Sequence, residues 1–227
     1  MEKNAQQPTE IKPKEAKPAA PRSASVTHAG NDRLGLDRLI FFSDAVFAIA
    51  ITLLALDINL PPAKDDVTNE ELWQMLAAIY HDYTAYAISF LVIGFFWLGH
   101  HTKFRSITRY DGVIIWLNFF LLMTVAFIPF PTRVMSDYIN STSTIFYAAT
   151  IVVAGMLTAA ISFYAVHNDR LVDPNTPLHR HMKQPWLLIG MPLIFLLSIP
   201  IAVYEPLAAR AFWLLLIPLQ VLKASRG

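Results

Sequence analysis

Cysteine is absent from this 227-residue chain, and charged residues are scarce. Without a thiol the chain can form no disulfide, no thiolate nucleophile and no Cys-ligated zinc site. Asp, Glu, Lys and Arg make up only 15% of the residues, whereas 55% are hydrophobic. An ordinary soluble domain is about 25% charged and about 45–50% apolar. The composition therefore indicates an all-α, polytopic membrane protein that has the bilayer as its solvent.

Familiar catalytic signatures are also missing. The sequence contains no Gly-x-Ser-x-Gly, no His-Glu-x-x-His and no Gly-rich phosphate-binding loop. These motifs supply, respectively, a serine nucleophile, a catalytic zinc site and a phosphate-binding loop. We therefore expect neither an enzyme nor a bound cofactor. The Thr-Val-Gly-Tyr-Gly filter of the usual potassium channels is absent as well, so a channel built from this chain would select ions by other means.

Residues 1–32 form a polar tail in which lysines are scattered among proline, alanine and serine. The tail has no apolar cluster able to form a core, so we predict that it is disordered. A six-helix transmembrane domain, residues 33–227, should follow. A span takes about 20 mostly apolar residues, and six segments qualify, at about residues 37–60, 80–98, 112–130, 144–166, 186–204 and 206–222. Pro61 and Pro131 should end the first and third of these helices.

Lysine and arginine fall mainly on one side of these spans. Fifteen of the eighteen share the side of the N-terminal tail, and the other side holds only Lys64, Arg133 and Arg210. Positive flanks are retained in the cytoplasm, so both termini are predicted to be cytoplasmic. An odd number of spans would destroy this alternation, which makes the charge pattern an independent argument for six.

Few polar side chains lie within the spans, where an unpaired charge costs at least about 2.5 kcal/mol. Asp44 is inside the first span, whereas Asp57 is near its end, where we favour an ordinary interfacial position. Arg38, the His100-His101 pair and Asn118 are candidate partners for Ser43 and Asp44 through charge-assisted hydrogen bonds. Adjacent histidines diverge by about 100° on a helix, so this pair is a poor chelator and we expect no metal site.

One stripe of the first span is apolar except for a threonine. Successive helical residues turn by about 100°, which places four residues within about 60° of Ile49: Ala45, Thr52, Leu53 and Leu56. Ser43 and Asp44 point about 120° to 140° away from Ile49, toward whatever packs behind the stripe. Geometry alone leaves open that the stripe merely faces lipid or a neighbouring helix.

Three stretches of sequence carry a family resemblance. Arg38, Phe42, Ser43 and Asp44 form an Arg-x-x-x-Phe-Ser-Asp motif; a second stretch is Phe-Trp-Leu-Gly-His-His at residues 96–101, and a third runs from residue 109 through Asn118 to residue 132. With these motifs the chain resembles the transmembrane protein 175 potassium-channel family, in its prokaryotic single-repeat form. The likeness is strong over about residues 33–135, whereas the last three spans agree mainly in number and hydropathy.

The resemblance implies a homotetramer in the plasma membrane, with the first helix of each subunit lining a central pore. Ile49 would form the main hydrophobic constriction, Leu53 and Leu56 would narrow the pore further, and Thr52 would add a ring of hydroxyls. Phe42 belongs to the signature motif, and the other matched residues would form a polar network that holds the pore helix: Arg38, Ser43, Asp44, Trp97, His100 or His101, and Asn118.

The function implied is a potassium-permeable channel with modest selectivity over sodium, because potassium sheds its water more readily. Its partners would be further copies of the chain, lipid, potassium and other monovalent cations, and no nucleic acid. A secondary transporter or proton pathway using Asp44 and the histidines is one alternative, although the first span lacks the internal Gly or Pro of many transporter helices. A non-conducting membrane scaffold is the other.

Overall fold

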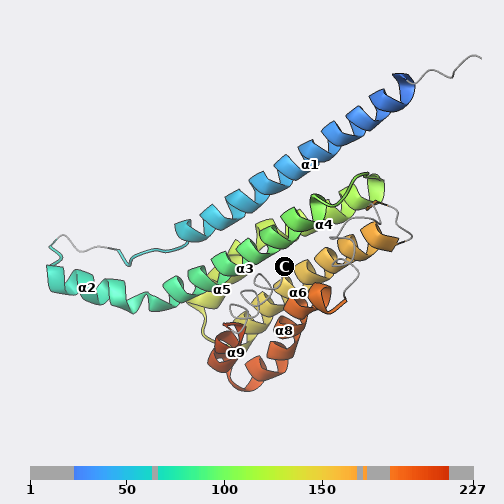
Figure 1. Ribbon diagram of the computed structural model, residues 1–227. Helices are drawn as coiled ribbons and strands as arrows, with labels where there is room; N and C mark the ends of the chain where they lie inside the picture. The colour runs from blue at the N-terminus through green and yellow to red at the C-terminus, as the bar shows by residue number, and fades with distance from the viewer. Residues whose placement is uncertain (1–22, 63–65, 168–170, 173–184, 215–227) are drawn as a thin grey trace, which may run out of the picture.

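The computed structural model of the chain describes residues 23–62, 66–167, 171–172 and 185–214. Within these residues the fold is all helical, apart from one isolated bridge between Ile107 and Val172. Figure 1 shows the helices, whose bounds are α1 Ser23–Leu56, α2 Asn69–Ala78, α3 Tyr80–Phe104, α4 Gly112–Phe127, α5 Pro129–Asp137, α6 Ser141–Val166, α8 Pro185–Tyr204 and α9 Pro206–Trp213.

Four helical segments of the described chain are long and apolar enough to cross a membrane: Arg33–Leu56, Tyr80–Phe104, Gly112–Asp137 and Ser141–Val166. They correspond to the first four predicted spans, although α3 continues six residues beyond the predicted end. The fifth predicted span falls on α8. The sixth begins with α9, but residues 215–222 lie outside the described part of the chain, so the count of six stays a prediction.

Three predicted boundaries are wrong. The first helix ends at Leu56, five residues before Pro61, so this proline does not end it. The third span does not end before Pro131; the helix breaks at Ile128 and resumes as α5, which runs to Asp137. Proline is well tolerated in the first turn of a helix, where its missing N–H would have no partner. The first helix begins at Ser23, so residues 23–32, expected in a disordered tail, are helical. No proline lies between Pro21 and Pro61 to interrupt it.

Side-chain caps explain where several helices begin. Asp111 accepts a hydrogen bond from the Ile114 amide at 3.0 Å at the start of α4, and Asn140 accepts one from Ser143 at the start of α6. Thr68 and Glu71 cap α2 reciprocally, each side chain accepting from the other's backbone N–H. The Thr68 backbone N–H and hydroxyl both donate to the Glu71 carboxylate, and they hold the pKa of this carboxyl below its ordinary value because they favour its charged form.

Helix α6 packs against the helices α3, α4, α5, α8 and α9. An added Cβ at Gly155 would lie 2.7 Å from the Pro192 side chain, so glycine allows α6 and α8 to approach closely. Helix α1 lies at the edge of the bundle (Figure 1), where it packs against α3, α4 and α5. Within the described residues, one face of α1 is therefore covered by α3, α4 and α5 and the other is not.

Candidate ion pathway and its supporting polar network

The two faces of α1 differ sharply in burial. Residues directed at α3 and α4 are buried: Ser43, Phe47, Ala50 and Leu54. On the opposite side, 58% of Ile49 and 73% of Leu56 are exposed, and Leu53 is exposed as well. The apolar stripe identified from the sequence is thus the face of α1 that a single chain leaves uncovered.

Thr52 places a hydroxyl group on this exposed face. Its Oγ1 donates a hydrogen bond to the Ile49 carbonyl at 2.9 Å, one turn earlier in the same helix. Because this bond uses the only hydroxyl proton, the lone pairs of the oxygen remain available as acceptors. Thr52 can therefore offer an oxygen atom to a cation passing along the stripe.

A chain of hydrogen bonds runs behind the stripe and connects α1 to α4 and α3. The Ser43 hydroxyl donates to the Leu39 carbonyl at 2.8 Å and accepts from Asn118 Nδ2 at 2.9 Å. Asn118 Oδ1 lies 2.8 Å from His100 Nε2. Ser43, His100 and Asn118 are all buried, so the network satisfies groups that would otherwise be costly in an apolar environment.

The hydrogen-bond directions show that Nε2 of the His100 ring carries a proton. Since Asn118 donates through Nδ2, its Oδ1 is the acceptor and His100 Nε2 is the donor. The ring stacks on Phe104, with centroids 4.1 Å apart, and lies 5.5 Å from Phe47. Its Nδ1 is buried without a hydrogen-bond partner among the described residues. The surroundings of His100 are thus aromatic on both sides, with a polar contact at one nitrogen.

A second contact joins α1 to α3. Trp97 Nε1 donates to Asp44 Oδ1 at 2.8 Å, and the Trp97 ring stacks with His101 at 5.5 Å. The two adjacent histidines therefore have different neighbours, His100 toward Asn118 and His101 toward Trp97. Among the described residues, no group of three His, Asp or Glu side chains is arranged to hold a metal ion.

Two residues of the Arg-x-x-x-Phe-Ser-Asp motif lie apart from these hydrogen bonds. Arg38 is exposed, and no ion pair joins it to Asp44 within the part of the chain that the structure describes. It lies on the same side of α1 as Ile49. Phe42 is also exposed and contacts Phe119 of α4, with ring centroids 5.7 Å apart. Within one chain, the structure brings Ser43 and Asp44 into the network but not these two.

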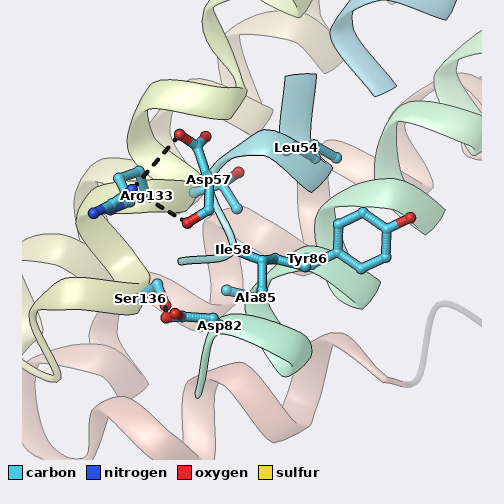
Figure 2. A pocket seen from close by; sticks show the side chains of 9 residues that line it. Leu54, Asp57, Ile58, Asp82, Ala85, Tyr86, Arg133 and Ser136 are labelled. Atoms are coloured by element: carbon cyan, nitrogen blue, oxygen red, sulfur yellow. Dashed lines mark hydrogen bonds and ion pairs between the residues drawn. The ribbon is translucent and has the colours of Figure 1, made fainter. Parts of the chain in front are cut away.

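Sequence reasoning missed a polar cluster at the end of α1. Figure 2 shows Arg133 of α5 beside Asp57 at the end of α1. Arg133 Nη1 lies 3.2 Å from the Asp57 carbonyl oxygen and 3.8 Å from the Asp57 carboxylate. Arg133 Nε also donates to Asp137 at 2.8 Å, and the Ser136 hydroxyl donates to Asp82 of α3. We call these five residues the Arg133 cluster. Its only sequence signal was that opposite charges share one predicted side of the membrane.

The comparisons with known proteins agree with this architecture. A family model described as the endosomal/lysosomal potassium channel TMEM175 matches residues 38–129. A potassium channel of Streptomyces collinus is 38% identical over 161 residues, which cover 67% of this chain and 77% of that relative. The chain belongs to the TMEM175 family. The TMEM175 match contains the exposed stripe of α1 and the whole polar network behind it, and the family is one of ion channels rather than enzymes.

Solved and animal TMEM175 proteins extend the comparison. The crystal structure of a lysosomal potassium-selective channel TMEM175 homolog from Chamaesiphon minutus superposes with a TM-score of 0.72 at 26% identity, covering 83% of this chain and 97% of that one. The human relative, named an endosomal/lysosomal proton channel, is 26% identical over 141 residues, and the match covers 28% of its length. The TMEM175 fold, with its membrane-spanning helices, is therefore common to this chain and a potassium-selective relative.

Proposed function

We propose that the chain is a potassium-permeable channel, modestly selective over sodium, in which four copies surround a pore lined by α1. The observation that carries this proposal is the uncovered stripe of α1, which contains Ile49 and Leu56 and lies opposite the face held by the polar network. A helix anchored on one side and apolar on the other is suited to meet its own copies around an axis. Membership of a potassium-channel family supports the same assignment.

The proposed constriction acts through water exclusion. Four Ile49 side chains around a narrow axis would leave no polar partner for water, and a dewetted segment blocks ions. Conduction then requires the four helices to separate or rotate. Thr52, one turn further along, would offer a ring of hydroxyl oxygens to a partly dehydrated ion. Potassium is favoured because it loses water more easily than sodium.

The proposed topology has six spans with both termini in the cytoplasm of a bacterial cell, and residues 1–32 on the same side. The Arg133 cluster supports the alternation, because it gathers the end of α1, the start of α3 and the end of α5. Lys103 and Arg105 lie at the other end of α3, on the side predicted to be cytoplasmic by its positive charge.

Cation flux into proteoliposomes tests the proposal. We expect potassium flux down its gradient, weaker sodium flux, and an increase in both when Ile49→Asn hydrates the constriction. Met156→Asn is the matched control, because Met156 is 63% exposed on α6, away from α1, and it should behave as the wild type. Equal flux from all three proteins would contradict a constriction at Ile49. Absence of flux from correctly inserted protein would favour a scaffold.

Proton permeation is a second candidate, favoured by the name of the human relative. A pH-sensitive dye inside the same vesicles would report it. Proton entry that persists without any potassium gradient would establish a separate proton conductance, whereas strict dependence on a counter-gradient would indicate a coupled transporter.

A further inference from the structure

Helix α2 carries an apolar face that the described residues leave largely uncovered. None of its residues is buried, and Trp73 is 70% exposed. With about 100° between successive residues, Trp73 and Leu76 lie within about 60° of each other, and Gln74 lies about 100° from Trp73. Leu72 lies at one edge of the apolar face and is also exposed. The helix is amphipathic, and within the described residues Leu72 and Trp73 on its apolar side are exposed while Leu76 is only partly buried.

Such a helix needs a partner to remain folded. It has ten residues, and isolated helices shorter than about 12–15 residues are marginal in water. The Thr68–Glu71 capping box stabilises its first turn, with the Thr68 amide donating to Glu71 at 2.9 Å. A cap leaves the apolar face exposed, so the cap does not account for that face.

We propose that α2 lies along the membrane–water interface, with its apolar face at the boundary between lipid headgroups and acyl chains. Helix α2 ends at Ala78, and the membrane-spanning α3 begins two residues later at Tyr80, so the end of α2 is held at the membrane surface. Figure 1 shows α2 bending away from the line of α3 beyond the end of the bundle. The proposal concerns lipid contact and does not depend on ion conduction.

The side chains identify lipid as the occupant. Exposed aromatic residues continue from Trp73 through Tyr80 and Tyr83 into the first turn of α3, and Trp and Tyr are enriched at membrane interfaces, where their rings are buried and their polar atoms stay hydrated. The polar face carries Glu70 and Glu71, and α2 contains no Lys or Arg. Attraction to anionic lipid is therefore excluded as the cause. Apolar burial suffices because α3 already tethers the helix.

The lack of native cysteine allows the test to use single-cysteine variants of the full chain. Nitroxide labels would be placed at Leu72 and Leu76 on the apolar face, and at Gln74 and Ala78 on the opposite side, with the capping box intact. Collision rates with oxygen and with a water-soluble nickel chelate would be measured in phosphatidylcholine vesicles. Unchanged oligomeric state and potassium flux would show that the labelled proteins are folded.

We expect the ratio of the oxygen collision rate to the nickel collision rate to be several-fold higher for labels at Leu72 and Leu76 than for labels at Gln74 and Ala78. The pattern should not change with anionic lipid or high salt. Equal nickel access at all four positions would overturn the proposal, because α2 would then project into water. Spin–spin broadening at Leu72 or Leu76 that disappears on dilution with unlabelled protein would also overturn it, because the apolar face would then contact a second copy.

Discussion

Trp97 Nε1 donates a hydrogen bond to the Asp44 carboxylate at 2.8 Å and so joins α3 to the middle of the membrane-spanning part of α1. A hydrogen bond to a charged group contributes about 1.5–3 kcal/mol. We expect Trp97→Phe to lower the free energy of unfolding by about this amount, measured by thermal melts in detergent. Trp116→Phe is the control, since Trp116 is exposed on α4. Equal losses would show that Trp97 acts only through ring packing.

Asp44 should matter for assembly before it matters for selectivity. Its carboxylate contacts Trp97 on the side of α1 away from Ile49, so Asp44→Ala removes a support of the proposed pore helix and leaves the proposed pore surface unchanged. We expect less tetramer, measured by native mass spectrometry, with an unchanged potassium-to-sodium ratio in the protein that remains assembled. A changed ratio with intact assembly would place Asp44 in the ion pathway.

Asn118 links Ser43 and His100, so its loss leaves the buried His100 Nε2 without a partner and removes one of the two hydrogen bonds of Ser43, which keeps its bond to the Leu39 carbonyl. Each buried unsatisfied polar group costs about 1–3 kcal/mol. Asn118→Leu should therefore lower the free energy of unfolding strongly. His100→Phe should lower it less in the Asn118→Leu variant than in the wild type, because residues in one network couple by about 0.5–3 kcal/mol. A double-mutant cycle of unfolding free energies measures this coupling. Strict additivity would contradict a connected network.

The hydroxyl of Thr52 is testable apart from its size. We expect Thr52→Ala to lower the potassium-to-sodium permeability ratio a few-fold, whereas Thr52→Ser should preserve most of it, because serine keeps the oxygen. Reversal potentials under bi-ionic conditions give the ratio directly. If both variants retain the wild-type ratio, selectivity arises elsewhere on α1.

Gly155 tests the close packing of α6 against α8. An added methyl group at Gly155 would lie 2.7 Å from Pro192, whereas one at Gly94 of α3 would meet nothing within 4 Å. Overpacking costs about 1–3 kcal/mol, so Gly155→Ala should lower the melting temperature while Gly94→Ala leaves it unchanged or raises it. A similar melting temperature for both variants would mean that α8 shifts freely against α6.

The sequence predicted the spans better than it predicted their contacts. Hydropathy located the first four membrane-spanning helices, and the helical wheel separated Ser43 from Ile49 correctly. It could not identify Phe47 or Phe104 as neighbours of His100, because lipid and protein interiors are equally apolar and hydropathy does not distinguish the residues that face each. The break at Ile128 was missed for another reason: proline was treated as a helix end, although it serves equally well at a helix start.

Helix α1 is held by side chains at two places, at Ser43 and Asp44 and again at Asp57, which Arg133 contacts. These places are thirteen or fourteen residues apart, about 20 Å along a helix that rises 1.5 Å per residue. Ile49, Thr52 and Leu53 lie between them. Turning the whole helix would break both attachments, whereas bowing its middle would keep them. If the proposed pore widens at Ile49 while both attachments stay in place, the middle of α1 therefore has to bend while its two attached regions stay fixed.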